Sequence, residues 1–113
     1  MNRPKLQPFE LVEDELVHSS SMLKAISHPA RLMILSLLLE KEKFVGEIQE
    51  ETGFSQPTIS RYLQQLMDTG LVRRRKDGAR AYYSVSSTEI INLLDSLKNA
   101  VDDCVNKGWI IGE

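Results

Sequence analysis

Residues 53–80 read GFSQPTISRYLQQLMDTGLVRRRKDGAR, and this stretch predicts a helix followed by a β-hairpin. Gly53 is typical of the end of a preceding helix, while Ser55 and Pro57 are typical of the N-cap and first turn of a new one. The new helix is expected to run to about Thr69, because Gly70 ends it. Its apolar positions recur at helical spacing and define the inward face: Ile59, Leu63, Leu66 and Met67.

The residues after this helix have the pattern of a β-hairpin. One strand is expected from Leu71 and a second over residues 81–85, with a turn at 76–79 between them. The turn contains Asp77-Gly78, and an Asp-Gly pair between two β-forming runs is a strong short-range hairpin signal.

Four further helices are expected, at about 8–26, 29–41, 45–52 and 87–106. The second is apolar over most of its circumference, which is typical of the buried centre of a small domain. The order of elements is therefore α-α-α-α-β-β-α, a mainly α fold with a two-stranded β-hairpin (α+β). At 113 residues, the chain is expected to form a single domain over residues 1–113.

Composition excludes several classes of protein. With 42% apolar and 27% charged residues, the chain is typical of a soluble globular domain. No uncharged apolar stretch approaches the roughly 18 residues of a membrane helix, and no apolar block follows the basic N-terminus as in a secretory signal. The one cysteine, Cys104, allows no intramolecular disulfide. We therefore expect a cytoplasmic protein with no membrane partner.

The net charge of −2 is distributed unevenly along the chain. Residues 53–80 contain six basic and two acidic side chains, so this segment carries +4 and the remainder −6. A polyanion responds to the local field within a Debye length of about 8 Å, and not to the average charge. The helix also lacks carboxylates over residues 56–65. A basic run is often only a solvated face, but a short helix, a turn, a polar-faced helix and a basic hairpin in succession predict a winged helix-turn-helix that binds DNA.

Individual side chains of this segment suit DNA. Gln56 and Gln64 can pair bidentately with adenine, and Arg61 with guanine, in the major groove. The serine and threonine hydroxyls nearby are short donors suited to phosphate oxygens, and the hairpin supplies cations to the backbone. The expected DNA-binding residues are Ser55, Gln56, Pro57, Thr58, Ser60, Arg61, Gln64, Arg73, Arg74, Arg75, Lys76 and Arg80.

Residues 23–35 (LKAISHPARLMIL), residues 53–72 and residues 73–83 (RRRKDGARAYY) are similar to the ArsR/SmtB family of bacterial and archaeal repressors. The similarity covers roughly residues 20–85, in order and without large gaps. It implies a homodimer with a recognition helix at about 56–69, a wing at about 71–85, and dimerisation helices at about 8–26 and 87–106. It also implies that the partner is double-stranded promoter DNA with an imperfect inverted repeat.

A heptad-like apolar seam on the last helix agrees with that implied dimer. Its members step by four, three, four and three residues from Ile90 to Cys104. The expected dimer-interface residues are Val12, Leu16, Ile90, Leu94, Leu97, Val101 and Cys104.

The metal sites of the family do not carry over to this sequence. Residues 43–47 have no thiol where the family has its Cys-Val-Cys type motif, and residues 88–103 have no histidine. Transition metals need imidazole or thiolate ligands, so no metal or other cofactor is expected. His18 and Cys104 remain weak candidates for a metal site shared across a dimer. His28, beside Pro29, is expected to be a helix-junction residue.

Cys104 has two interpretations: a small hydrophobe buried on the seam, or an intersubunit disulfide that acts as a redox switch. The mechanism of the persulfide-sensing family members needs two cysteines per chain and is excluded. Trp109 is expected to pack back on the core or on the partner. No nucleophile–base pair or phosphate loop indicates an enzyme.

The sequence thus predicts a homodimeric, sequence-specific repressor. The alternatives are a winged-helix protein-interaction module that does not read DNA, and a redox-responsive regulator that switches through Cys104. The operator, the regulated genes and the effector stay open.

Overall fold

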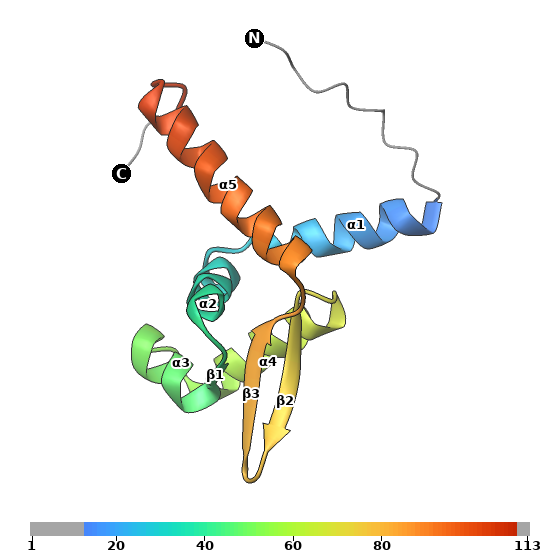
Figure 1. Cartoon of the computed structure of the whole chain (residues 1–113), viewed down its shortest axis with the longest axis vertical. Helices are drawn as coiled ribbons and strands as arrows, with labels where there is room; N and C mark the ends of the chain where they lie inside the picture. Colours follow the sequence, from blue (N-terminus) through green and yellow to red (C-terminus); the bar gives the residue numbers. More distant parts are fainter. Residues whose placement is uncertain (1–12, 111–113) are drawn as a thin grey trace.

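The computed structural model describes residues 13–110 and has the predicted winged helix-turn-helix architecture (Figure 1). The first predicted helix is seen from Glu13, so its residues 8–12, Val12 included, lie outside the described residues. The elements are α1 (Glu13–Ile26), α2 (Pro29–Glu40), β1 (Lys43–Phe44), α3 (Val45–Thr52), α4 (Gln56–Asp68), β2 (Val72–Asp77), β3 (Arg80–Val85) and α5 (Thr88–Asn106).

Helix α2 is the centre of the core, as its apolar circumference predicts. Ile34, Leu35 and Leu38 are buried among residues of α1, α3, α4, the sheet and α5. The helix begins at Pro29, where a missing N–H costs no intrahelical hydrogen bond. His28 precedes it as the N-cap, and its Nδ1 accepts a hydrogen bond of 3.2 Å from the Ala30 N–H. The expectation that His28 is a junction residue is confirmed.

The turn between α3 and α4 uses the two caps that the sequence predicts. Gly53 ends α3 with a φ of 76°, and its N–H donates to the Gln49 carbonyl at 2.8 Å. Only glycine adopts that left-handed conformation without a steric penalty. Ser55 begins α4, because its Oγ accepts a hydrogen bond from the Thr58 N–H at 3.3 Å. These two caps end α3 and begin α4 at the residues that the sequence predicts.

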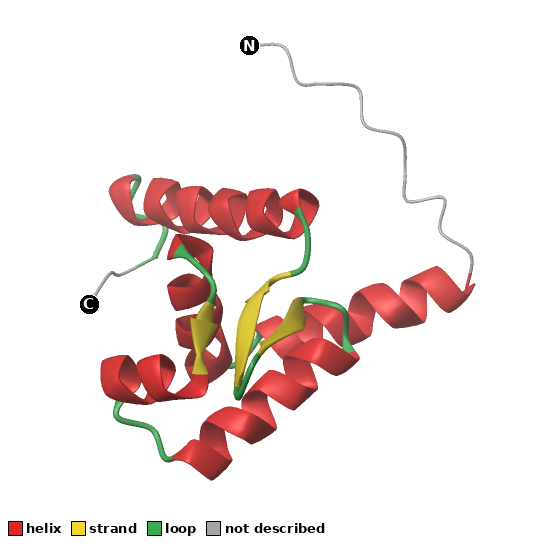
Figure 2. Ribbon diagram, turned by 60° about the horizontal axis from the view of Figure 1, so that its bottom comes forward, coloured by secondary structure: helices red, strands yellow, loops and turns green. Residues whose placement is uncertain are grey.

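The sheet has three strands where the sequence predicted two. The predicted hairpin forms between β2 and β3, and β1 adds to the other edge of β3, giving the antiparallel order β1-β3-β2 (Figure 2). Strand β1 has only Lys43 and Phe44, which pair with Tyr83 and Tyr82. A strand of two residues is too short to show an alternating pattern in the sequence. It forms because the edge of β3 offers hydrogen bonds to it.

The hairpin turn lies one residue later than predicted. Asp77 pairs with Arg80 in the ladder, so the two-residue turn is Gly78-Ala79. Gly78 has a φ of 64°, and no residue other than glycine has a positive φ in the described part of the chain. Glycine at the first of two turn residues is the pattern of a type II′ turn, whose twist suits a hairpin.

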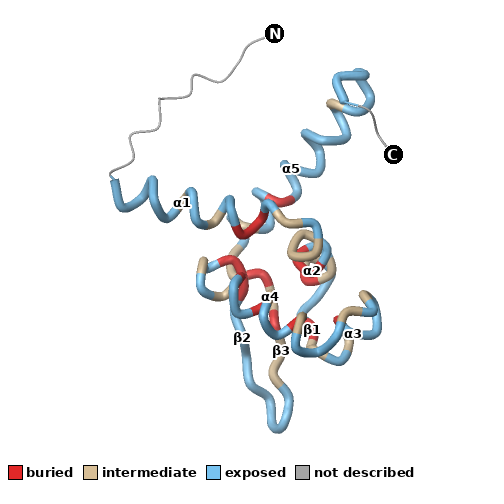
Figure 3. Tube along the Cα trace, turned by 180° about the vertical axis from the view of Figure 1, so that it is seen from behind, coloured by how far each residue is buried: buried red, intermediate tan, exposed pale blue. Residues whose placement is uncertain are grey.

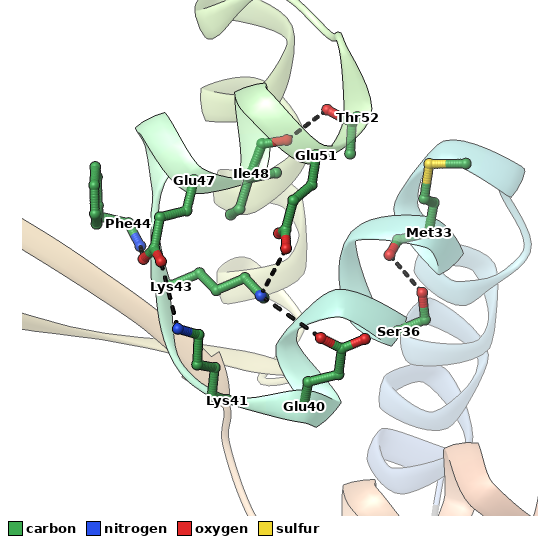
Figure 4. A network of polar contacts seen from close by, with 10 residues as sticks. All are labelled: Met33, Ser36, Glu40, Lys41, Lys43, Phe44, Glu47, Ile48, Glu51 and Thr52. Atoms are coloured by element: carbon green, nitrogen blue, oxygen red, sulfur yellow. Dashed lines mark hydrogen bonds and ion pairs between the residues drawn. The ribbon is translucent and has the colours of Figure 1, made fainter.

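Lys43 is the one buried charged residue among residues 13–110, with 2% of its side chain exposed. Its Nζ lies 3.1 Å from Oε1 of Glu51 on α3 and 3.8 Å from Oε2 of Glu40 at the end of α2 (Figure 4). The ammonium group therefore joins α2, β1 and α3, and the two carboxylates compensate its loss of hydration. This network positions the first helix of the helix-turn-helix on the core.

Helices α1 and α5 extend away from the core, and most of their surface is exposed (Figure 3). In α5 only Leu94 is buried, and in α1 only Ala25 and Ile26. No single helix among residues 13–110 is long and apolar enough to cross a membrane; α1 and α2 satisfy that test only as a pair, bent by 91° at the break between them.

Candidate nucleic-acid interface

The exposed face of α4 is uncharged or cationic along most of its length. Ile59, Leu63 and Leu66 are buried in the core, and this confirms the predicted inward face, to which Met67 adds a half-buried side chain. On the opposite side the exposed residues are Gln56, Pro57, Ser60, Arg61, Gln64 and Gln65. The first carboxylate of the helix is Asp68, at its C-terminal end.

Two predicted phosphate donors are instead engaged with each other. The Ser55 hydroxyl donates to Oγ1 of Thr58 at 2.8 Å and accepts the Thr58 N–H, so its capacity serves the N-cap. Thr58 is half-buried and keeps its own hydroxyl proton. Ser60 is fully on the exposed face, one turn of helix from Gln56 and Gln64.

The side chains of Arg61 and Gln64 are oriented by neighbours on α4. The Arg61 guanidinium lies over the Tyr62 ring, 5.3 Å from its centroid, which leaves its donors free to turn outward. Nε2 of Gln64 donates to Oδ1 of Asp68 at 2.8 Å. Because that bond uses one of four hydrogen-bonding positions of the amide, Gln64 can still accept and donate at a base edge.

Arg31 connects α4 to the end of α1, and sequence reasoning missed this contact. Its Nε donates to the Ala25 carbonyl at 2.6 Å and its Nη2 to the Lys24 carbonyl at 3.3 Å. Its Nη1 donates to Oε1 of Gln65 at 2.9 Å, across 34 positions of sequence. The planar fork of a guanidinium suits such a set of acceptors. Arg31 lies within residues 23–35, but no local pattern in the sequence indicates that its partner on α4 is Gln65.

The wing, formed by β2, β3 and the turn between them, has two faces. Alternate side chains of a strand point to opposite faces, and the pairing of Val72 with Val85 aligns the two strands. The inner face continues from the core that carries α4 and consists of Val72, Arg74, Lys76, Ala81, Tyr83 and Val85. The outer face consists of Arg73, Arg75, Asp77, Arg80, Tyr82 and Ser84.

The basic side chains of the two faces differ in the contacts that they make. Arg74 and Lys76 on the inner face are exposed and make no hydrogen bond or ion pair within residues 13–110. On the outer face, Nε of Arg73 lies 3.4 Å from the neutral Oγ of Ser84, and Arg73 forms no ion pair within residues 13–110. Arg80 lies over the Phe44 ring, 4.2 Å from its centroid. Cation–π contact leaves the positive charge of Arg80 uncompensated.

Arg75 is paired with carboxylates. Its Nη2 lies 2.6 Å from Oε1 of Glu42 and its Nε 3.2 Å from Oε2, which is a bidentate arrangement. Its Nη1 lies 3.7 Å from Oδ2 of Asp77, and its guanidinium lies over the Tyr82 ring at 5.0 Å. The hydrogen bond from Arg75 lowers the pKa of Glu42 below its ordinary value, and the charge of Arg73 adds to the effect.

Large apolar side chains are exposed on both helices that the sequence assigns to dimerisation. On α1, Leu16 is 48% exposed, and on α5 Leu97 and Val101 are 41% and 44% exposed. Ile90 and Cys104 of the predicted seam are half-buried, whereas Leu94 is buried in the core of its own chain. Further exposed apolar residues that the prediction omitted are Val17, Leu23, Ile91, Leu93 and Val105. So many large apolar side chains left exposed on these helices favour an interaction face there.

The weak metal candidates lie apart from other ligands. His18 is exposed on α1 and Cys104 half-buried on α5, and the described residues contain no cluster of three or more His, Cys, Asp or Glu side chains that could hold a metal ion. Trp109 does not pack on the core of its own chain: it is 68% exposed, with the Lys107 ammonium 4.8 Å from its ring centroid. The expectation that Trp109 packs on the core of its own chain is therefore wrong, and its packing on a partner stays a prediction.

The chain is similar in sequence to a known family of regulatory proteins and to several of their named members. Residues 28–74 match the family model described as bacterial regulatory protein, arsR family. The chain is 35% identical over 78 residues to the biofilm growth-associated repressor of Xylella fastidiosa, covering 69% of this chain and 68% of that one. It is 38% identical over 76 residues to the transcriptional activator HlyU of Vibrio cholerae, covering 67% and 70%.

Among solved structures, the chain is similar to a homodimeric winged helix-turn-helix DNA-binding domain from Mycobacterium bovis, described as a possible ArsR-family transcriptional regulator. The TM-score is 0.79 at 29% identity, over 88% of this chain and 92% of that one. The likeness therefore extends beyond the helix-turn-helix itself.

Proposed function

The chain belongs to the arsR family of bacterial regulatory proteins, and from that membership we propose that it acts as a homodimeric repressor on an operator with an inverted repeat. As a member of the family it is a winged helix-turn-helix DNA-binding regulator of transcription and not an enzyme. Our proposal adds the roles of individual residues, the dimer and the direction of regulation.

We assign sequence readout to α4. The observation that carries this assignment is its exposed face, which lacks carboxylates over residues 56–65 and adjoins a cationic wing. Bidentate contacts to base edges come from Gln56, Arg61 and Gln64, while Thr58 and Ser60 approach the groove closely. Contacts to the phosphate backbone come from Arg73, Arg74, Lys76 and Arg80 of the wing.

The proposed dimer uses α1 and α5. The exposed apolar side chains of both helices support it, since a chain that stayed monomeric would leave them in water. A two-fold axis between two copies would present two α4 helices to successive major grooves, about 34 Å apart. An operator read in this way has inverted-repeat symmetry.

Repression is proposed because the family similarity implies it and because the Xylella fastidiosa relative is a repressor; the Vibrio cholerae relative is named an activator. Residues 43–47 and 88–103 lack the thiol and imidazole ligands of the family's metal sites, so the proposed regulator does not use those sites. We place it in the cytoplasm, where its promoter DNA is.

Selection of bound fragments from a genomic DNA library, followed by footprinting, tests the function. The expected result is a protected site of two half-sites on one face of the duplex, with affinity that falls steeply as salt rises. A footprint on a single half-site would contradict the dimer. Failure to bind any fragment would favour the alternative of a protein-interaction module.

A further inference from the structure

Glu42 lies in the segment between α2 and β1, 33 positions away from Arg75 in the sequence, yet the two side chains form a bidentate pair. No feature of the helix-turn-helix requires a carboxylate at this place. A negative charge beside a DNA-binding wing repels phosphates, so its presence there needs a physical explanation.

The Arg75 guanidinium has three partners among the described residues, and 52% of its side chain is exposed. Nε and Nη2 donate to Glu42, Nη1 lies near Asp77, and one face covers the Tyr82 ring, which belongs to the cross-strand partner of Arg75. Two carboxylates therefore compensate its charge. To contact a phosphate, Arg75 would have to leave partners that the same chain holds beside it.

The other cations of the wing are not paired in this way. Within residues 13–110, Arg73 and Arg80 contact only a hydroxyl and an aromatic ring, and Arg74 and Lys76 form no ion pair. Arg74 and Lys76 also share the inner face, on the side of the core that carries α4. Cations without an ion pair therefore lie on both faces of the wing, and Arg74 and Lys76 are the two on the side on which α4 would meet DNA.

We propose that Glu42 is a positioning residue of the DNA-binding surface: it holds Arg75 on the outer face of the wing as a brace between the wing and the α2–β1 segment. Arg75 then does not contact phosphate, and the backbone contacts of the inner face come from Arg74 and Lys76. This inference rests on the proposed DNA-binding function and refines it, because it removes one arginine from the predicted contacts.

The salt dependence of binding tests the proposal, because the magnitude of the slope of log K against log salt is about 0.9 for each phosphate that the protein neutralises. Binding to a labelled random-sequence duplex of about 40 base pairs is measured by fluorescence anisotropy at several KCl concentrations, with the whole chain. Arg74→Gln should reduce the magnitude of the slope by about 0.9 per subunit, or about 1.8 for a dimer. Arg75→Gln should leave the slope unchanged.

Glu42→Gln tests the opposite change, in which Arg75 loses its carboxylate partner. Release of Arg75 should increase the magnitude of the slope by up to about 0.9 per subunit and raise affinity at low salt several-fold. Arg75→Gln added to Glu42→Gln should abolish that increase. Glu50→Gln is the matched control, since Glu50 is exposed on α3 and its substitution removes the same charge. Circular dichroism confirms that each variant is folded.

Three outcomes would overturn the role of Glu42: a decrease of slope in Arg75→Gln equal to that in Arg74→Gln, no change of slope in Glu42→Gln, or an equal increase in Glu50→Gln. If the unmodified protein binds no duplex at any salt concentration, the DNA-binding function fails as well. That result is distinct from the other three.

Discussion

Arg61 and Gln64 lie one turn apart on α4, and both carry the donors that distinguish one base pair from another. Arg61 is oriented by the Tyr62 ring, and Gln64 is held by Asp68 through one of its amide protons. Neither contact uses all the hydrogen-bonding groups of the side chain. The residues thus have a defined orientation and free hydrogen-bonding capacity, which is what direct readout needs.

We predict that Arg61→Ala and Gln64→Ala each weaken operator binding about 5- to 150-fold, because a good bidentate pair contributes about 1–3 kcal/mol of discrimination. Binding to random-sequence DNA should change much less for Gln64→Ala, which removes no charge. Gel-shift titration on the selected operator and on a scrambled duplex measures both. Asn92→Ala, on the exposed face of α5, is the control. Unchanged operator affinity in both α4 variants would show that α4 does not read the bases.

The ionisation of Glu42 reports its pair with Arg75. Because the hydrogen bond lowers the pKa of Glu42, the contribution of the pair to stability is complete above the ordinary glutamate pKa of about 4.3. It is lost as the pH falls through the lower pKa of the folded state. We expect the NMR titration midpoint of the Glu42 carboxyl to lie below about 4.3 and to rise in Arg75→Gln. If the Glu42 midpoint is the same in Arg75→Gln as in the unmodified protein, the pair does not form in solution.

The turn between α3 and α4 shows how one residue determines the geometry of an element. Gly53 has a φ of 76°, and open space surrounds the position that a Cβ would occupy. We predict that Gly53→Ala lowers the free energy of unfolding by about 1 kcal/mol, since a left-handed conformation is strained for a residue with a Cβ. Gly53→Asn should cost less, because asparagine tolerates this conformation. Thermal unfolding of both variants measures the difference, and equal losses would point to a cause other than backbone strain.

The contact between α1 and α4 depends on Arg31. We predict that Arg31→Lys lowers the free energy of unfolding by about 1.5 kcal/mol, because an ammonium group cannot reach the Ala25 and Lys24 carbonyls and Gln65 together. Denaturant titration checks this value. Lys24→Arg, which keeps the backbone carbonyl and the charge, should be neutral. A stability equal to that of the unmodified protein in Arg31→Lys would exclude a structural role for the fork.

At the scale of the whole molecule, we propose that two copies assemble through the exposed apolar faces of α1 and α5. We predict that Val101→Glu raises the dimer dissociation constant at least about tenfold, because a buried unpaired carboxylate is costly. Sedimentation analysis at several concentrations measures the constant. Asn99→Glu adds the same charge on the opposite side of α5 and should leave it unchanged. Equal weakening by both substitutions would place the interface elsewhere.

The charge distribution also acts at this scale. The chain has a net charge of −2, but residues 53–80 carry +4 and the remainder −6, and a dimer doubles both. The acidic remainder repels DNA away from α4 and the wing, which orients the approach. Glu42 is part of this arrangement, because it compensates Arg75 and leaves the other four cations of the wing without an ion pair among the described residues.

Features that depend on neighbours along the chain could be predicted from the amino-acid sequence. Gly53, Ser55, Pro29 and Gly78 act through their own φ angles and through hydrogen bonds within four residues, so the helix ends and the hairpin follow from local pattern. The inward face of α4 follows from its 3.6-residue period. The turn of the hairpin was displaced by one residue because an Asp-Gly pair fits more than one turn register.

Pairings between distant positions became visible only in the folded chain. Strand β1 forms on the edge of β3, Lys43 is buried between two carboxylates, and Arg31 meets Gln65 and Arg75 meets Glu42 across 34 and 33 positions. Each pairing depends on where the chain returns in space, and no periodicity or cap encodes that. The sequence therefore predicted which residues could face DNA, whereas the packing of the wing against the α2–β1 segment determines which of its cations remain free to do so.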